Sequence, residues 1–392
     1  MITTIAVHGY RSLRDLAVPL APVTLVTGPN GAGKSSLYRA LRLLAATASD
    51  GVVASLATEG GLDRVLWAGP EVVSGAMRRG EVPVQGTSRR SKPVSLMLGL
   101  ATEELGYLID VGLPTPSQTA FARDPQIKRE EIFAGPVLRP SARLVQRKGG
   151  TVTVIDDEPR PLGTRLSPRV SMLSELADPD GYPEISWARR LVGSWRFYDS
   201  FRTDGAAPAR SSCVGTWTPV LADDGHDLPA AVQTILESAW AGPFSSAFED
   251  AFPGSRVQVD AAGSDGRFRL EVHQPGMLRP LGAEELSDGT LRFLLLLTAL
   301  LSPQPPGLLV LNEPETSLHP HVLPVLARLV TEVAARTQVM IVSHSEELTN
   351  PLRDHGDEDT PVVHHHLVKN TGETTIEGRG LLTRTPWEWG RR

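Results

Sequence analysis

The segment VTLVTGPNGAGKSS, residues 23–36, carries the residues whose types and spacing point most directly to chemistry. From Gly28 to Ser35 it fills the pattern G-x-x-x-x-G-K-[ST], in which glycines let backbone N–H groups come close to phosphate oxygens. Lys34 is then placed to reach the β- and γ-phosphates of a nucleotide, and the Ser35 hydroxyl to bind Mg²⁺. The alternative is a glycine-rich surface turn that carries a lysine. The candidate nucleotide-binding residues are Gly28, Pro29, Asn30, Gly31, Ala32, Gly33, Lys34, Ser35 and Ser36.

Polar residues also follow two apolar runs near the end of the chain. The run GLLVLNEPE ends in Asn312, Glu313 and Glu315, and the run QVMIVSH delivers Ser343 and His344. Open α/β sheets bind their ligands at the carboxyl ends of parallel strands. We therefore expect these two groups of side chains at one edge of a sheet.

The segment EELSDGTLRFLLLLTALL predicts a buried helix with a polar start. Ser287 and Asp288 are good capping residues, Gly289 permits close backbone approach, and the following residues to Leu301 are apolar on nearly all faces. One reading is a well-capped core helix. The other is a second anion site at the exposed N-terminus of that helix.

The remaining pattern indicates the elements that position these groups. Residues 2–20 predict two antiparallel strands joined by a turn at Gly9, residues 23–27 a buried strand, and residues 93–111 and 151–155 three more strands. A helix with Asp227 as its N-cap and apolar positions as far as Ala239 follows, then a hairpin over residues 257–272, and a helix that starts at Pro320.

Composition sets the class of protein. The 392 residues are 41% hydrophobic and 21% charged, with a net charge of −6, which is typical of a globular chain and argues against a uniformly basic nucleic-acid-binding protein. The lone Cys213 fits a reducing compartment, and the longest apolar run, residues 293–301, is too short to span a membrane. We expect a cytoplasmic protein.

Basic clusters lie in the middle of the chain. Arg78-Arg79, Arg89-Arg90-Lys92 and Arg143-Arg147-Lys148 are candidates for contact with a nucleic-acid backbone, and ordinary ion pairs explain them as well. The run His364-His365-His366, and His319 with His321, are weaker candidates for a metal site. Successive side chains of a strand alternate faces and do not converge on one ion.

Four segments in order, GPNGAGKSS, LSDGT, LLVLNEPE and IVSHS, resemble the motifs of the ABC-type ATPase heads of the RecF, SMC and OLD-like group. The likeness is greatest to stand-alone AAA-family ATPases whose acidic motif reads NEPE or DEPE before SLHP. The early GYRSL and the closing TPWEWG are similar to that group too. The resemblance covers residues 1–50 and 215–392.

This resemblance implies an α/β P-loop NTPase fold: an ABC-type head with a mixed central sheet, an antiparallel β lobe and a lid-like insertion. The head would span residues 1–392, with an N-terminal lobe at 1–70, the insertion at 71–215 and a C-terminal lobe at 216–392. The interval between the motifs is too short and too rich in proline for the long coiled-coil arms of SMC proteins.

The resemblance also implies roles. Residues 28–36 match the Walker A loop, and residues 308–312 the Walker B strand. Glu313 matches the carboxylate that polarises the attacking water, and His344 the switch histidine that senses the γ-phosphate. Ser287 and Gly289 match the signature that closes over the nucleotide of a partner, so that two heads sandwich two ATP molecules.

Three departures from the family bear on activity. Asn312 stands where an aspartate beside Mg²⁺ is usual, so turnover is slow, or Glu313 or Glu315 supplies the missing charge. Asp288 replaces a glycine of the transporter signature, which points away from transport. No position matches the glutamine that reads Mg²⁺, and Gln85 is a poor guess.

The sequence therefore predicts an ATPase that uses ATP and Mg²⁺, with Glu313, His344 and Lys34 as catalytic residues and Ser35 and Asn312 at the metal. ATP would drive homodimerisation, coupled to DNA or to a separate effector protein in DNA repair or phage defence. The alternative is a nucleotide-gated scaffold with little or no turnover because of Asn312. A membrane partner is not expected.

Overall fold

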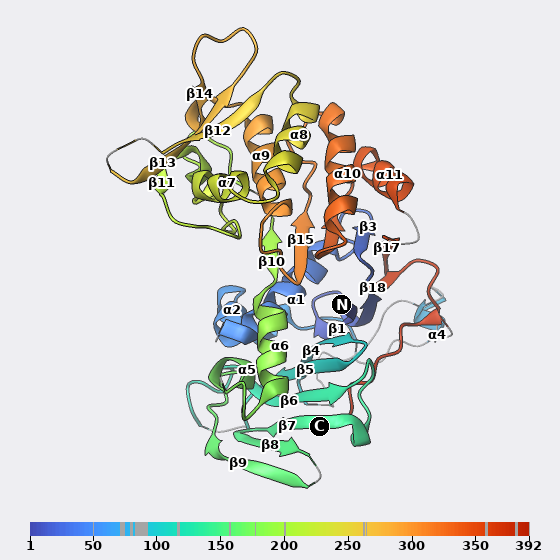
Figure 1. The fold of residues 1–392 in the computed structure, drawn as a ribbon. Helices are drawn as coiled ribbons and strands as arrows, with labels where there is room; N and C mark the ends of the chain where they lie inside the picture. Colours follow the sequence, from blue (N-terminus) through green and yellow to red (C-terminus); the bar gives the residue numbers. More distant parts are fainter. Residues whose placement is uncertain are drawn as a thin grey trace. The chain divides into compact units, whose positions relative to one another are not determined.

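The computed structural model describes residues 1–49, 51–70, 75–78, 81–82, 93–115, 118–156, 158–176, 178–199, 201–261, 263, 265–356, 360–380 and 383–391. They form two compact units (Figure 1). Unit 1 comprises Met1–Ala21, Val26–Trp195 and His365–Arg392, and unit 2 comprises Pro22–Leu25 and Arg196–His364. The chain therefore passes between the units four times.

Unit 1 is built on an antiparallel sheet of eight strands in the order β2-β1-β4-β5-β6-β7-β8-β9. Their bounds are β1 Ile2–Tyr10, β2 Leu13–Pro19, β4 Leu96–Thr102, β5 Leu105–Gly112, β6 Gln126–Ala134, β7 Arg143–Lys148, β8 Thr151–Ile155 and β9 Pro159–Arg165. The strands predicted in residues 2–20, 93–111 and 151–155 are confirmed. This sheet is the antiparallel lobe expected of the fold class.

The turn predicted at Gly9 is wrong. Gly9 lies inside β1, and the chain turns at Arg11 and Ser12, between β1 and β2. Gly9 has a φ of 79°, and a Cβ there would lie 2.5 Å from the carbonyl oxygen of Ser95. The glycine thus marks a close approach of two backbones rather than a turn.

Helices of unit 1 pack on one face of this sheet, among them α1 and α6. The helical segments are α1 Lys34–Ala45, η1 Ala46–Ser49, α2 Val52–Thr58, α3 Leu62–Val65, α4 Gly75–Arg78, η2 Pro140–Ala142, α5 Met172–Glu175 and α6 Pro183–Gly193. On the helical face Glu130 and Arg147 are fully buried and 2.6 Å apart, and the Tyr107 hydroxyl donates to Glu130 at 2.7 Å.

This burial corrects one of the nucleic-acid candidates. Arg147 is 0% exposed because it pairs with Glu130, and Arg143 donates to the buried Glu131 at 2.9 Å. Arg147 is therefore closed to a phosphate backbone, while Arg143 is 22% exposed and bound to Glu131 through Nε. Arg79, Arg89, Arg90 and Lys92 of the other clusters lie outside the described residues, as does Gln85.

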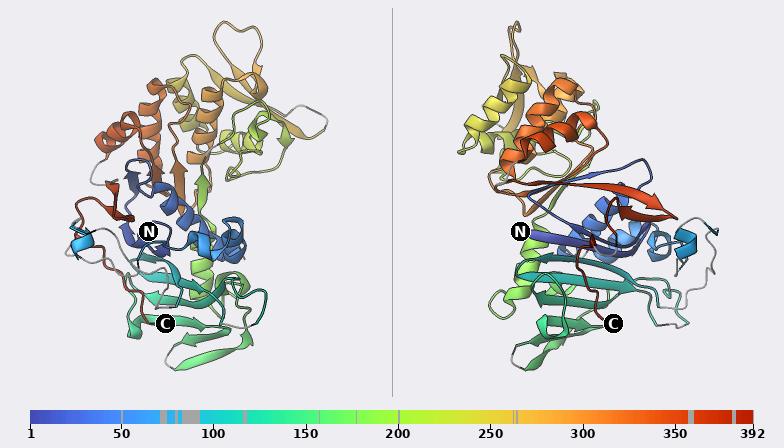
Figure 2. Two further views of the ribbon diagram at one scale, coloured as in Figure 1. Left: turned by 180° about the vertical axis from the view of Figure 1, so that it is seen from behind. Right: turned by 90° about the vertical axis from the view of Figure 1, so that its right-hand side faces the viewer.

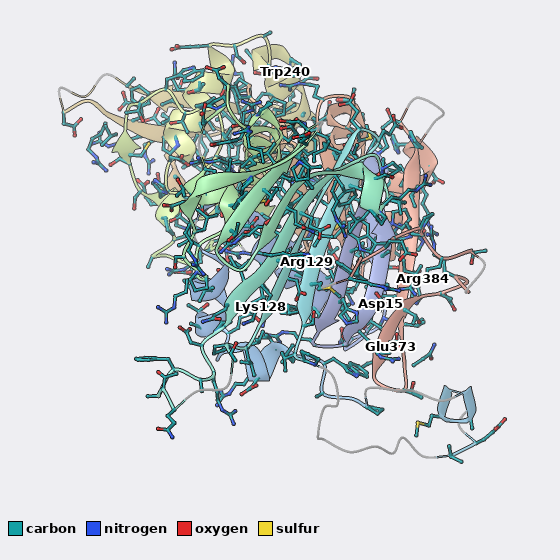
Figure 3. All side chains as sticks on the ribbon, turned by 90° about the horizontal axis from the view of Figure 1, so that it is seen from below. Asp15, Lys128, Arg129, Trp240, Glu373 and Arg384 are labelled. Carbon is teal, nitrogen blue, oxygen red and sulfur yellow. The ribbon has the colours of Figure 1, made fainter. Side chains whose placement is uncertain are left out.

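The opposite face of the sheet holds the C-terminal segment, residues 383–391 (Figure 2). Side chains of successive β6 residues point to opposite faces, so Arg129 faces this segment while Glu130 faces the helices. Arg129 is 2% exposed and donates to the carbonyls of Trp389 at 2.6 Å and Arg391 at 2.9 Å. Figure 3 labels Arg129, Asp15 and Arg384. The ion pair between Arg384 and Asp15 attaches the C-terminal segment to β2.

The sheet of unit 2 is parallel, in the order β10-β15-β16, followed by the first residues of β3 and then of β17. Its strands are β10 Arg196–Tyr198, β15 Leu308–Asn312 and β16 Gln338–Val342, with β3 Val23–Thr27 and β17 Val362–Asn370 continuing along the chain into unit 1. In unit 1, β17 pairs antiparallel with β18 Glu373–Ile376. The predicted strands at 23–27, 308–312 and 338–342 are confirmed, as is the α/β class.

A largely apolar helix, α9, lies at the centre of unit 2. Every residue of α9 (Asp288–Leu300) from Thr290 onward is buried, and α7, α8 and α10 pack around it. Each buried leucine stabilises such a core by about 1.5–3 kcal/mol. The remaining elements are η3 Pro208–Arg210, β11 Cys213–Val214, α7 Leu228–Leu236, α8 Ala241–Ala251, β12 Arg256–Asp260, β13 Arg267–His273, β14 Leu281–Gly282, η4 Ala283–Glu285, η5 Pro320–Val322, α10 Leu323–Val333 and α11 Glu346–His355.

Two helix boundaries differ from those predicted. α7 follows Asp227, but that side chain does not cap it; the Asp227 carboxylate accepts from the backbone N–H of Ala222 at 3.0 Å, and α7 ends at Leu236. Pro320 begins a short 3₁₀ turn, and α10 follows from Leu323. The hairpin of β12 and β13 is confirmed. Nowhere in the described part of the chain is a helix both long and apolar enough to cross a bilayer.

Candidate functional site

The glycine-rich loop of unit 1 has the expected strand–loop–helix form. It leads from β3 into α1, whose first residue is Lys34. Gly28 and Gly33 have φ values of 147° and 112°. A Cβ at Gly28 would lie 2.4 Å from the carbonyl oxygen of Leu367, and one at Gly33 2.2 Å from the Thr374 hydroxyl. Only glycine fits both positions.

Lys34 lies inside this loop. It is 7% exposed, and its Nζ donates to the carbonyls of Gly28 at 2.5 Å and Pro29 at 3.4 Å. The ammonium is therefore held against the loop backbone at the start of α1, where a helix dipole also favours an anion. The neighbouring Ser35 is exposed, which leaves its hydroxyl accessible to a ligand.

Side chains of β17 and β18 contact the loop and the end of β3. The hydroxyl of Thr374 lies 2.7 Å from the Ala32 carbonyl oxygen and 2.8 Å from the Ser12 hydroxyl. The hydroxyl of Thr27 lies 3.0 Å from Nδ1 of His366. The loop is thus tied to the strand pair that follows unit 2 in the sequence.

The acidic motif and the histidine meet in unit 2. The backbone N–H of Glu313 donates to the Val342 carbonyl at 2.7 Å, which brings the ends of β15 and β16 together. As a result Nδ1 of His344 lies 3.4 Å from Glu313 Oε1 and 3.5 Å from Glu315 Oε1. The side chains of Glu313 and His344 are 45% and 57% exposed, so both are accessible to a ligand.

The backbone of Glu313 lies in the left-handed region. Its φ is 48°, a left-handed value that is uncommon for a residue with a long side chain. Glu315, by contrast, is 7% exposed, and its Oε1 accepts hydrogen bonds from the Ser343 hydroxyl at 2.7 Å and from the His344 N–H at 3.2 Å. Glu315 therefore positions the histidine, while Glu313 faces outward.

The signature residues lie at the exposed start of α9. The Ser287 hydroxyl caps the helix by accepting from the Thr290 N–H at 3.1 Å, and both Ser287 and Asp288 are exposed. A Cβ at Gly289 would come within 3.0 Å of the Ser317 carbonyl oxygen, so the glycine lets α9 begin close to the loop after Glu313. The predicted capping by Ser287 is confirmed.

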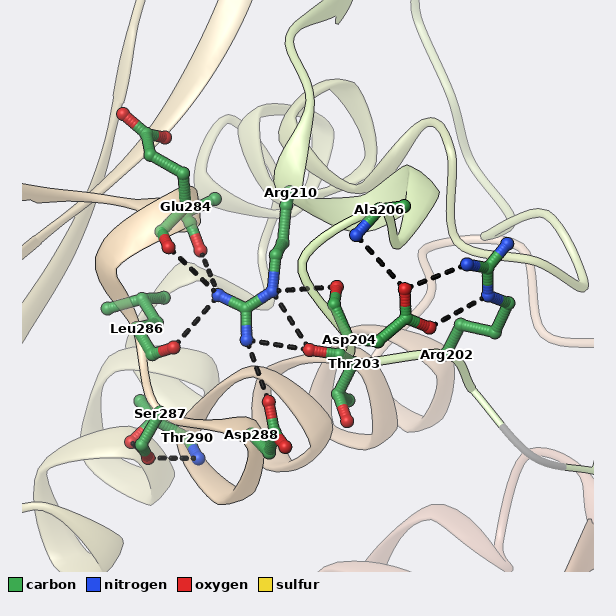
Figure 4. Close-up of polar contacts among 11 residues, drawn as sticks. Arg202, Thr203, Asp204, Ala206, Arg210, Glu284, Leu286, Ser287, Asp288 and Thr290 are labelled. Atoms are coloured by element: carbon green, nitrogen blue, oxygen red, sulfur yellow. Dashed lines mark hydrogen bonds and ion pairs between the residues drawn. The ribbon is translucent and has the colours of Figure 1, made fainter.

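Arg210 holds the signature loop, residues 283–288, and no pattern in the sequence predicts this role (Figure 4). Its side chain is only 9% exposed. It donates to the carbonyls of Ala283 at 2.9 Å and Leu286 at 2.8 Å, to the Asp288 carboxylate at 2.8 Å, and to the Thr203 carbonyl at 2.7 Å. One guanidinium thus joins the signature to the segment after β10.

The segment after β10 makes two further contacts that the sequence does not predict. Asn312 Nδ2 donates to Asp199 Oδ1 at 2.6 Å, and the buried Arg292 donates to the carbonyls of Phe201 at 3.2 Å and Glu313 at 3.1 Å. Burial lowers the pKa of Arg292, and the carboxylates of Glu315, Asp199 and Glu313 oppose that shift. The only signal in the sequence is the short apolar strand WRFY before Asp199.

The histidine run does not converge. In unit 1, His365 is buried with Nε2 2.8 Å from the Pro19 carbonyl oxygen, and His366 contacts Thr27. In unit 2, His364 contacts Arg353 and His319 contacts His321. Within the described ranges, no three His, Cys, Asp or Glu side chains are grouped to hold a metal ion.

A cavity of about 380 Å³ in unit 1 is lined by residues of β1, β2, β18 and the segment after β18, and by none of residues 28–36. Its charged side chains largely pair with one another: Arg14 contacts Glu373 at 3.3 Å, and Arg384 contacts Asp15. The predicted site residues thus lie in two groups: the loop in unit 1, and Asn312, Glu313, His344, Ser287 and Gly289 in unit 2. Their combination into one site stays a prediction.

Comparison with known proteins identifies two matching family models. Residues 1–65 match the family described as "AAA ATPase domain". Residues 175–350 match the family described as "AAA domain, putative AbiEii toxin, Type IV TA system". Together these matches contain all of the residues predicted to bind nucleotide.

One curated relative is the OLD nuclease of Thermus scotoductus, 43% identical over 44 residues. That match covers 11% of this chain and 8% of the relative's length. Among solved structures, an SMC head bound to the C-winged helix domain of ScpA is similar over 97% of this chain and 98% of its own, with 13% identity and a TM-score of 0.48. The SMC head domain from Thermotoga maritima covers 97% and 99%, with 14% identity and a TM-score of 0.44.

Proposed function

We propose that this chain, which belongs to the ABC-type and OLD-like AAA ATPase heads, binds ATP with Mg²⁺ and hydrolyses it to ADP and phosphate. The observation that carries the proposal is the loop of unit 1, which has three features of a phosphate-binding loop. Gly28 and Gly33 adopt conformations only glycine fits, Lys34 is buried against the loop, and α1 begins there.

The loop residues from Gly28 to Ser36 would surround the β- and γ-phosphates, with Lys34 as the charged contact. Oxygen ligands suit Mg²⁺, and the exposed Ser35 hydroxyl and the amide oxygen of Asn312 fit that requirement. Bound Mg²⁺ supplies neutralisation of the charge that develops on the phosphate oxygens. Asn312 itself adds no negative charge to such a site.

Glu313 is the proposed general base. Its carboxylate is accessible, and its position beside His344 places the base next to a side chain able to contact the γ-phosphate. Glu315 keeps the histidine in place through its bonds to Ser343 and to the His344 N–H. In this assignment Glu313 takes a proton from the attacking water, and His344 reports the presence of the γ-phosphate.

We also propose that ATP drives association of two copies. Ser287 is exposed and Gly289 is partly exposed at the N-terminus of α9, which supports access of a second copy to both. An N-terminal helix end favours anionic phosphate oxygens. In the group that the sequence resembles, this signature closes over the nucleotide of the partner.

The test is steady-state hydrolysis of ATP by the natural chain and by Glu313→Gln. The proposal expects the substitution to abolish turnover while ATP binding persists. The matched control is Glu249→Gln, which removes an exposed carboxylate on α8 and is expected to leave the rate unchanged. Equal rates for the natural chain and Glu313→Gln would remove Glu313 from the proposed role.

A nucleotide-gated scaffold with negligible turnover is the second candidate, and Asn312 is the observation that favours it. Such a scaffold would bind ATP, dimerise and recruit a partner, and it would release that partner slowly because ATP is hardly hydrolysed. Asn312→Asp separates the two candidates. A large increase in the rate of ATP hydrolysis would show that Asn312 limits turnover in the natural chain, as the scaffold candidate requires. Rates of ATP hydrolysis measured with and without DNA then test whether the ATPase is coupled to DNA rather than to a separate effector protein.

A further inference from the structure

The carboxylate nearest to Asn312 comes from a neighbouring strand. β10 and β15 are parallel, and Tyr198 is in register with Leu311. Asp199, the residue after β10, therefore lies beside Asn312, the last residue of β15. Asn312 Nδ2 donates to Asp199 Oδ1 at 2.6 Å, which directs the amide nitrogen toward Asp199 and leaves the amide oxygen as an acceptor.

We propose that Asp199 supplies the negative charge that Asn312 lacks, so that the Asp199–Asn312 pair together binds the hydrated Mg²⁺ of the nucleotide. This inference rests on the proposed function and refines it. Carboxylate and amide oxygens are ligands that suit Mg²⁺, either directly or through its waters. The amide of Asn312 orients the Asp199 carboxylate, as hydrogen-bonded neighbours orient metal ligands elsewhere.

The other two carboxylates of the motif are less suited to this task. Glu315 is 7% exposed, its Oε1 accepts two hydrogen bonds, and its Oε2 accepts none from the described part of the chain but is buried, so the carboxylate is shielded from a hydrated ion. Glu313 lies 3.4 Å from His344 and is already assigned, in the proposed function, as the base for the attacking water. Asp199 is exposed, and among the described residues its second oxygen accepts no hydrogen bond from a side chain.

One buried guanidinium holds both members of the pair in place. Arg292 donates to the carbonyl of Phe201, two residues after Asp199, and to the carbonyl of Glu313, the residue after Asn312. Since Arg292 is 4% exposed, these bonds are shielded from water. The geometry of Asp199 and Asn312 is therefore preorganised rather than left to two mobile side chains.

Exchange of the two groups gives the sharpest test. Asp199→Asn removes the charge, Asn312→Asp places two carboxylates side by side, and the double variant Asp199→Asn with Asn312→Asp restores one of each. ATP affinity is measured for each chain in EDTA and in Mg²⁺, and Mn²⁺ affinity is measured by electron paramagnetic resonance with ATP bound. Asp224→Asn, an exposed aspartate of unit 2, is the matched control.

We expect Asp199→Asn to weaken Mn²⁺ binding about 10- to 100-fold while ATP affinity in EDTA stays within about twofold of the natural chain. The double variant should recover most of the Mn²⁺ affinity, and Asp224→Asn should lose none. Unchanged Mn²⁺ affinity in Asp199→Asn, or a double variant no better than Asp199→Asn alone, would overturn the inference. Failure of the natural chain to bind ATP even in Mg²⁺ would instead overturn the proposed function, and the inference with it.

Discussion

Arg292 donates a hydrogen bond from Nη2 to the backbone carbonyl of Glu313, at 3.1 Å. Arg292 belongs to α9, the helix that begins at Ser287, and Glu313 follows the acidic strand β15. A buried charged donor links the signature helix directly to the backbone of the proposed base. If a second copy displaced α9, the Arg292 hydrogen bond would therefore move the backbone of Glu313.

Arg292→Lys should lower kcat about 10- to 100-fold with little change in ATP affinity, because a small displacement of a catalytic group is costly while the loop of unit 1 is untouched. Steady-state kinetics and calorimetric ATP binding check this. Arg336→Lys is the control, since Arg336 also donates to a backbone carbonyl, that of Ser302 at 3.2 Å, but lies on no predicted motif. A normal kcat in Arg292→Lys would separate α9 from the base.

Arg210→Lys should weaken ATP-dependent dimerisation about tenfold or more. Lysine keeps the charge but loses the planar fork that contacts Ala283, Leu286 and Asp288 together, and each lost charged hydrogen bond is worth about 1.5–3 kcal/mol. Analytical ultracentrifugation in the Glu313→Gln background, which retains ATP, measures the effect. Arg279→Lys, which alters an exposed ion pair with Glu285, should leave the dimer constant unchanged. Equal dimer constants in both variants would contradict the prediction.

Thr374→Val should lower ATP affinity about fivefold. The substitution keeps the shape of the side chain but removes the hydroxyl beside the Ala32 carbonyl, a loss of about 1 kcal/mol. Thr375→Val is the control, because side chains of adjacent strand residues point to opposite faces. Calorimetric titration with ATP and Mg²⁺ gives both affinities, and identical values would show that β18 does not support the loop.

Asp15→Asn should release the C-terminal segment. Asp15 is partly buried, which alone would raise its pKa, but the nearby His8 ring and the hydrogen bonds from Arg384 and Trp389 prevail and lower the pKa well below its usual range. Its contribution is therefore complete above the ordinary aspartate pKa of about 3.9 and is lost as the pH falls through the lower folded value. Acid, rather than base, undocks the segment.

Limited proteolysis of residues 383–391 checks this prediction at pH 7, where Asp15→Asn should be cleaved about tenfold faster than the natural chain. Trp fluorescence during acid titration should show a transition that Asp15→Asn lacks. Asp124→Asn, which breaks an exposed ion pair with Arg169, serves as the control. Equal protection of the segment in Asp15→Asn would contradict the proposed attachment.

The parts of the site that the sequence predicts well are the local ones. The glycine positions of the loop, the strands before Asn312 and Ser343, and the cap at Ser287 each depend on a few neighbouring residues, so their patterns are visible in the chain. The buried helix α9 is predicted for the same reason, because its apolar run leaves no polar face.

The rest depends on contacts between residues far apart in sequence. The segment KREE, residues 128–131, has the composition of a solvated strand, yet Glu130 and Glu131 are fully buried because Arg147 and Arg143 neutralise them from β7. Asp199 and Arg210 lie in a stretch without a motif, and their roles arise only when β10 pairs with β15 and the signature loop closes on Arg210. Periodicity carries no information about such pairings.

The proposed function depends on binding of the ATP triphosphate by the loop around Lys34. Calorimetric titration of the natural chain with ATP and Mg²⁺ tests it most directly, beside Lys34→Ala and a control, Lys148→Ala, at an exposed lysine of unit 1. We expect saturable binding that weakens roughly 10- to 100-fold in Lys34→Ala, because a charged contact is lost, and that is unchanged in Lys148→Ala. No binding by the natural chain, or equal binding by Lys34→Ala, would contradict it.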